Sequence, residues 1–296
     1  MQKYKTAIAD LTLLFVVFIW GTTFALMKDI IPGIPPLNFI FLRFVLATLL
    51  MTILYWQRIK KVKWDLFKLG VTLGLALAGG YFFQITGLQF TSASRAGFIT
   101  GLSVVIVPII STLYLKKLPP LAAILGVVMA LLGLLFLFYD GDWAFNIGDL
   151  LVFFCAISLG IHIFLVGQFV KNRDPVILTI IQLGTVGILA GIIAGFQGEL
   201  KIIYPIRIWW RIAYMAVMAT GLAFLVQNWA QQFTSAIKTA IIFSMEPVFA
   251  FVFAIFWLGE PITLGSFVGG GFIIIGMIMA ELGDYFKEKR RSGNNG

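Results

Sequence analysis

The chain has 296 residues, of which 60% are hydrophobic and 12% are charged, and its formal net charge is +9. The charged fraction is about half of that in a typical soluble globular protein, which excludes a soluble domain of ordinary composition. In a soluble protein this positive charge would suggest nucleic acid as a partner. In so apolar a chain, cationic loops at a membrane surface explain it better, and no nucleic-acid partner is expected.

Long apolar segments recur along the whole chain. A bilayer core about 30 Å thick requires roughly 20 apolar residues in a helix. Segments of that length predict an all-α, multi-pass protein of the cell (inner or plasma) membrane, with ten transmembrane helices and the lipid bilayer around it. In chain order, the predicted spans are residues 9–27, 37–56, 69–90, 95–115, 121–138, 147–168, 176–196, 208–231, 238–258 and 262–281.

The distribution of positive charge predicts the orientation of these spans. An even number of spans places both termini on one side of the membrane. Most of the 22 Lys and Arg residues lie in segments on that same side, including the tail at 287–291. Basic loops favour the cytoplasm, so both termini are expected there. The basic loop at 197–207 is the exception, because it is predicted to lie outside.

The sequence nearly repeats itself. Gln-Phe-Thr-Ser-Ala at 89–93 recurs at 232–236, an offset of 143 residues, and the earlier spans align at an offset of 139, which pairs Asp10 with Asp149. Each copy holds five spans, an odd number, so the second copy must enter the membrane the opposite way up.

The sequence therefore predicts two inverted five-helix repeats. The first covers residues 1–140, and the second covers residues 141–296 and includes a basic cytoplasmic tail. Inverted repeats are common in secondary transporters, where the substrate site lies between the halves near the middle of the membrane.

Three segments resemble one transporter family. Residues 244–280 hold a Glu-Pro pair that opens a small-and-aromatic helix, then Leu-Gly-Glu, then a Gly-rich last helix. Residues 88–115 look like the fourth helix of that family, and Phe-Ile-Trp-Gly at 18–21 is similar to its first. In these features the chain resembles the EamA-type transporters of the drug/metabolite transporter superfamily. The first half departs from the pattern, with Lys116 and Lys117 in place of Leu-Gly-Glu.

The resemblance implies ten helices, two inverted halves and a central cavity, and it indicates which classes of solute to expect. Known members move amino acids, amines, sugars, nucleotide sugars or drugs, often as exporters. We therefore expect a secondary transporter that works by alternating access and exports amino acids or related amphipathic or aromatic metabolites. A carrier of drugs or of sugar- or nucleotide-type solutes is the alternative.

Other classes of protein fit the sequence less well. With one Cys, one His and no pair of carboxylates within a span, the chain lacks the residues of an intramembrane enzyme. No filter-like loop suggests a channel. No cofactor or metal is expected, the partner is a small-molecule substrate, and proton coupling is left open. Both a monomer and a homodimer are compatible with two fused halves.

Charged residues at membrane depth are the first candidates for the site, because they are costly there. Glu246 could bind a cationic group or a proton, or could be a structural carboxylate with buried partners. Arg43 could bind a carboxylate or phosphate, or could extend to the outer interface. His162, the single histidine, could relay protons, although a lone histidine in an apolar helix more often makes a structural hydrogen bond.

Amides and aromatic residues complete the predicted substrate site. Gln84, Gln227 and Asn228 are related by the repeat and could recognise a polar solute from both halves, or could join helices. The candidate aromatic walls are Trp20, Tyr81 and Trp229, for which packing is an equally good explanation.

Two further sets of residues are expected to be structural. Arg95 and Lys238 follow the repeated Thr-Ser-Ala turns and are predicted to anchor opposite membrane faces. Glycines in the two last helices of the halves should let these helices approach closely, and they are Gly126, Gly133, Gly269 and Gly276.

Overall fold

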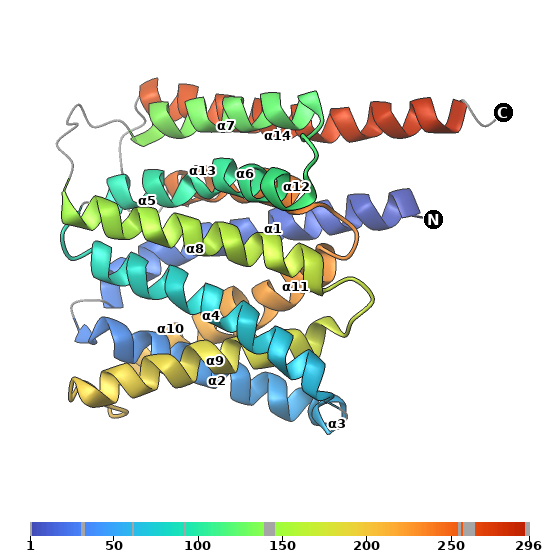
Figure 1. Ribbon diagram of the computed structural model, residues 1–296. Coiled ribbons are helices and arrows are strands. Elements are labelled where there is room, and N and C mark those ends of the chain that lie inside the picture. Colours follow the sequence, from blue (N-terminus) through green and yellow to red (C-terminus); the bar gives the residue numbers. More distant parts are fainter. Residues whose placement is uncertain are drawn as a thin grey trace.

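The computed structural model describes residues 2–30, 33–60, 62–91, 93–138, 146–253, 256 and 264–293. These residues form helices, turns and loops and include no strand (Figure 1). Each predicted span contains helix. The elements are α1 (Gln2–Ile30), α2 (Pro36–Leu54), α3 (Trp56–Ile59), α4 (Trp64–Gly87), α5 (Ala93–Gly101), α6 (Ser103–Leu115), α7 (Leu121–Phe138), α8 (Ile147–Phe169), α9 (Pro175–Phe196), α10 (Ile206–Tyr214), the π-helix η2 (Met215–Leu222), α11 (Ala223–Ala230), α12 (Ala236–Phe243), α13 (Glu246–Phe253) and α14 (Leu264–Gly293).

Several helices are long and apolar enough to cross a bilayer. Among the described residues, six segments meet that criterion, namely 4–23, 36–54, 64–87, 147–169, 175–196 and 206–230. Shorter apolar helices cover residues 99–115, 121–136 and 267–279. The prediction of an all-helical, multi-pass membrane protein is confirmed, whereas the count of ten spans and the side of the termini stay predictions.

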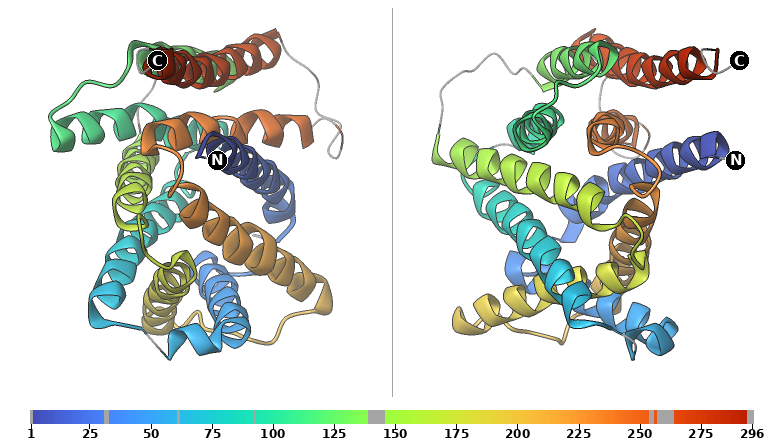
Figure 2. Two further views of the ribbon diagram at one scale, coloured as in Figure 1. Left: turned by 90° about the vertical axis from the view of Figure 1, so that its right-hand side faces the viewer. Right: turned by 45° about the vertical axis from the view of Figure 1, so that its right-hand side comes forward.

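The helices pack in an order that the two halves share. Helix α7 packs on α14 at one edge of the molecule, and α2 packs on α9 at the other (Figures 1 and 2). Between these edges, α4 contacts α8 and α9, while α11 contacts α1 and η2 contacts α2. Helices that occupy matching positions in the sequence repeat thus make matching contacts.

Glycines allow α7 and α14 to approach each other closely, as predicted. A Cβ atom on Gly133 of α7 would lie 2.5 Å from the carbonyl oxygen of Gly269 in α14. A Cβ atom on Gly276 would lie 2.6 Å from the carbonyl oxygen of Gly126. The two contacts are related by the offset of 143, so each half provides the same pair of glycines.

Two predicted spans are broken helices rather than continuous ones. The span at 95–115 divides into α5 and α6 at Leu102, and the span at 238–258 contains α12 and α13, separated by Ser244 and Met245. Both breaks have the same backbone hydrogen bonds, from Leu102 N to Ile99 O (3.1 Å) and from Met245 N to Ile242 O (3.0 Å). In the second half, the ring of Pro247 prevents a continuous helix.

A third predicted span, at 208–231, contains the π-helix η2. Its counterpart in the first half, α4, is an uninterrupted α-helix. A π-helix bonds each N–H to the carbonyl five residues earlier, which widens the turn, and such segments are frequent at functional sites. Here η2 contacts α1 and α2, two helices of the first half.

Candidate functional site

Arg43 is buried in the middle of the fold and does not extend to an interface. It lies on α2, and 4% of its surface is exposed. Its Nε donates to the hydroxyl of Thr220 (2.6 Å), and a terminal nitrogen donates to the carbonyl of Ala219 (3.1 Å), both in η2. An arginine has five N–H donors, so these two bonds fix the guanidinium plane and leave donors for another partner.

Trp20 of α1 shares an acceptor with Arg43. Its indole nitrogen donates to the Ala219 carbonyl over 2.9 Å. The Trp20 ring also packs against Phe224 (5.7 Å between centroids) and Phe243 (5.0 Å). One carbonyl of η2 therefore holds two side chains of the first half.

An aromatic layer surrounds the guanidinium of Arg43. The carbon at its centre lies 5.7 Å from the Tyr81 ring and 5.8 Å from the Phe44 ring, within the range of cation–π attraction. Phe44 and Tyr81 meet edge to face at 4.9 Å, and Phe44 also contacts Phe224. Helices α1, α2, α4 and α11 each contribute to this layer.

Glu246 is the first residue of α13, directly after the helix break. A carboxylate in the first turn is stabilised by the positive end of the helix dipole. The side chain is half-buried, and α13 packs against α1, the helix that carries Trp20. Within the described part of the chain, Glu246 and Arg43 form no direct ion pair. Gly21 allows α13 to approach, since a Cβ there would lie 2.6 Å from that of Phe249.

His162 borders this group but makes a hydrogen bond elsewhere. Its ring meets Phe224 edge to face at 5.9 Å, and its Nε2 lies 3.0 Å from the Oε1 of Gln182 in α9. Both residues are nearly inaccessible, at 2% and 0% exposed. The arrangement matches the structural alternative for His162 and also places the ring beside the aromatic layer.

The amides of α11 belong to a polar network between α8, α9 and α11. Asn228 donates to Thr179 (2.7 Å), Gln227 donates to Gln231 (3.2 Å), and Gln231 donates to the carbonyl of Ile163 (2.9 Å). Two buried acceptors, Gln227 Oε1 and Asn228 Oδ1, have no hydrogen-bond partner among the described residues. They are groups through which the network can bind a further polar molecule.

Two predicted residues lie apart from this centre. Gln84 donates weakly to Thr100 (3.5 Å), a residue of its own half. Trp229 stacks edge to face on Phe233 (5.3 Å) within the cluster of Ala9, Leu13, Ala230 and Ile242. The structure brings together Arg43, Glu246, Trp20 and Tyr81, with His162 at their edge, and we call these five residues the central site.

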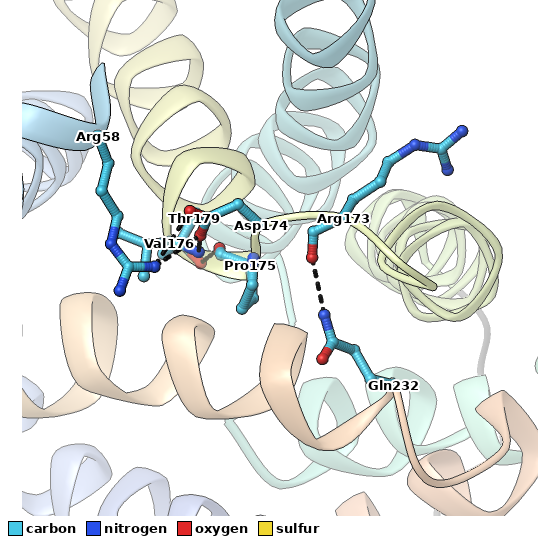
Figure 3. Close-up of polar contacts among 7 residues, drawn as sticks. All are labelled: Arg58, Arg173, Asp174, Pro175, Val176, Thr179 and Gln232. Carbon is cyan, nitrogen blue, oxygen red and sulfur yellow. Dashed lines mark hydrogen bonds and ion pairs between the residues drawn. The ribbon is translucent and has the colours of Figure 1, made fainter. Parts of the chain in front are cut away.

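Loop 171–174 lies between α8 and α9 and makes polar contacts with Arg58 and Gln232 (Figure 3). Asp174 caps α9 by accepting from the Val176 amide (2.9 Å), and it also forms an ion pair with Arg58 (3.0 Å). Gln232 donates to the Arg173 carbonyl (2.9 Å). These contacts tie the α2–α4 connection to α9 and α11.

The sequence did not reveal the part that η2 has in the central site. Ala219 contributes a main-chain oxygen, which no sequence pattern reports. Thr220 is an ordinary residue in an apolar segment, and its type gives no signal of the contact with Arg43.

Lys238 differs from its predicted role as an interfacial anchor. It is 5% exposed, and its ammonium lies 2.7 Å from the carboxylate of Asp10. The counterpart side chain, Arg95, lies outside the described part of the structure, as do Gly259 and Glu260 of the family signature.

Comparison with known proteins gives a consistent family. The profile of the EamA-like transporter family matches the chain twice, over residues 7–139 and 146–282. An uncharacterized transporter of Archaeoglobus fulgidus is 35% identical over 281 residues, covering 95% of this chain and 88% of the relative. The uncharacterized transporter YoaV of Bacillus subtilis is 30% identical over 289 residues, covering 94% and 97%. A crystal structure at 17% identity shares the fold, with a TM-score of 0.79 over 93% of this chain and 97% of that one.

Proposed function

We propose, since this chain belongs to the EamA-like transporter family, that it exports a small amphipathic metabolite carrying both a carboxylate and an amine, such as an amino acid. The observation that carries the proposal is the pair of opposite charges at the central site. The guanidinium of Arg43 lies against the aromatic layer, and Glu246 opens α13, which packs on α1, the helix that carries Trp20.

Each part of such a solute has a matching group. The guanidinium of Arg43 is suited to the two oxygens of a carboxylate. The carboxylate of Glu246 is suited to an ammonium group. Trp20 and Tyr81, which are half-buried, offer rings for an apolar or aromatic side chain.

The arrangement of the site supports alternating access between inverted halves. Arg43, Trp20 and Tyr81 come from the first half, while Glu246, Ala219 and Thr220 come from the second. A movement of one half against the other changes the distance between the two charges. The broken helix before Glu246 also fits a transporter, because discontinuous helices direct their ends at bound solutes in other secondary transporters.

The test is counterflow in proteoliposomes with three related labelled solutes: an amino acid, its decarboxylated amine and its deaminated acid. The zwitterion should exchange fastest. Arg43→Gln should lose the preference for the carboxylate and Glu246→Gln the preference for the amine, in protein shown to be folded by size-exclusion chromatography. Faster exchange of sugars, nucleotides or uncharged drugs than of the zwitterion would contradict the proposal.

The same vesicles test proton coupling, which we propose to involve Glu246. A pH gradient should drive accumulation in the parent protein, and Glu246→Gln should exchange solute without responding to the gradient. Accumulation by the variant equal to that of the parent protein would exclude Glu246 as the proton carrier.

A further inference from the structure

Two buried aspartates lie outside the central site and near opposite ends of the molecule. Asp10 is on α1 and Asp149 is in the first turn of α8, and the offset of 139 relates them. They are 9% and 1% exposed. Figure 1 shows that α1 and α8 begin on opposite sides of the molecule. The proposed substrate contacts use neither residue.

Asp10 is held by the second half. Its carboxylate lies 2.7 Å from the ammonium of Lys238, and the two side chains are 10% and 6% exposed. Lys238 is in the first turn of α12, where its amide donates to the capping hydroxyl of Ser235 (3.2 Å). The carboxylate of the first half is therefore attached to the turn that ends the second Gln-Phe-Thr-Ser-Ala string.

Asp149 is held by the first half in the corresponding place. Its Oδ1 accepts from the hydroxyl of Thr91 over 2.6 Å, and Thr91 belongs to the first Gln-Phe-Thr-Ser-Ala string. Its Oδ2 accepts from the Asn146 amide (3.1 Å), which fixes the carboxylate at the start of α8. The two repeated sequence elements thus meet twice, each time across the boundary between the halves.

We propose that these contacts are two latches, one for each end of the transporter. The α1 latch is Asp10 with Lys238, and the α8 latch is Asp149 with Thr91. Each latch holds its own end closed to water and separates when that end opens. The inference rests on alternating access in the proposed function, but it does not depend on the identity of the solute.

The physical reason lies in where the polar groups are. A buried ion pair that loses one partner leaves an uncompensated charge, so the pair separates only where water can solvate both groups. Opening an end provides that water, and closing it removes the water again.

The test measures access of water to each end separately, with matched cysteine probes. Leu13 and Val152 are both 0% exposed, are related by the offset of 139 and lie one turn beyond Asp10 and Asp149. Leu13→Cys and Val152→Cys are introduced one at a time with Cys155→Ala, which removes the single native cysteine. Labelling by a charged maleimide is followed in nanodiscs, where both faces are in contact with the reagent.

The expected result is a crossed pattern. Asp10→Asn should raise the labelling rate of the Leu13→Cys probe by about tenfold or more and leave the Val152→Cys probe unchanged. Asp149→Asn should raise the labelling rate of the Val152→Cys probe and leave the Leu13→Cys probe unchanged. Thr91→Val should act as Asp149→Asn does, with a smaller effect. Asp65→Asn, an exposed carboxylate in the first turn of α4, is the control and should change neither probe.

Two outcomes would overturn the proposal. Equal increases at both probes would show that the aspartates only stabilise the fold, and no increase at either would show that the contacts do not control access. If Asp10→Asn does not fold, the double variant Asp10→Lys, Lys238→Asp replaces it. This variant keeps an ion pair, so its probe should be labelled at the rate of the parent protein. Labelling needs no solute, so the two proposals can fail separately. A crossed labelling pattern without counterflow of any of the three solutes would contradict the proposed solute and still support the latches.

Discussion

The two broken helices have the same backbone and different chemistry. Both breaks lie at the same place in the repeat and have the same hydrogen bonds, but α6 begins with Ser103 where α13 begins with Glu246. Other members of the central site also differ from their counterparts. Arg43, Tyr81 and Trp20 correspond to Gln182, Phe224 and Leu159. Repetition thus explains the scaffold, and the departures from it coincide with the site that we propose for the solute.

The largest effect is expected when Glu246 of the second half is replaced by serine, the residue at the matching position of the first half, Ser103. Glu246→Ser should reduce counterflow of the zwitterionic solute by about 100-fold, because the charged partner of the solute's ammonium group is lost. Ser103→Ala is the matched control and should stay close to the parent rate. Similar losses in both folded variants would remove the functional distinction between the halves.

Where the halves are alike, substitutions should have equal effects. Gly133→Ala and Gly276→Ala should each lower the free energy of unfolding by about 1–3 kcal/mol, since the added methyl group meets a backbone carbonyl of the partner helix. Gly271→Ala is the control, because a Cβ there meets nothing within 4 Å. Thermal unfolding in detergent measures all three, and a clear difference between the first two would contradict the reciprocal contact.

The π-helix η2 distinguishes the halves a second time, through Thr220. Thr220→Val keeps the shape but removes the acceptor of Arg43 Nε, and should raise the KM for the zwitterion by about tenfold. Thr220→Ser keeps the hydroxyl and should restore the parent value. A fall in the maximal rate with unchanged KM would instead assign Thr220 to the movement of the halves.

The smallest effect is expected outside the central site. Trp229→Phe keeps an aromatic ring beside Phe233 and should change the counterflow rate by less than about twofold, because surface and packing-neutral exchanges cost little. A loss approaching that of Glu246→Ser would show that Trp229 contacts the solute after all.

Much of the scaffold could be predicted because it depends on patterns that recur in the sequence. Apolar length predicted the helical segments, and the offset of 143 correctly related the glycines of α7 and α14. The breaks at Leu102 and before Glu246 were not predicted, because apolar character continues across them. Periodicity reports which residues are apolar and does not report which backbone bonds are made.

Side-chain charge identified candidate site residues in the sequence, whereas the main-chain contacts around them could not be predicted. Arg43 and Glu246 were found because charges are rare in apolar segments. Ala219 could not be found, since its contribution is a carbonyl oxygen. Lys238 was wrongly predicted to be an interfacial anchor, because its partner Asp10 lies 228 residues away and becomes its neighbour only in the folded chain.

The hydrogen bond from Trp20 to Ala219 has a use in optical measurement. The donor is an indole of the first half and the acceptor belongs to the second, so a relative movement of the halves changes the surroundings of a natural fluorophore. The chain has eight tryptophans, and the difference between the emission spectra of the parent protein and Trp20→Phe isolates this one. A shift of that component on adding solute would follow the rearrangement in real time, in unlabelled protein.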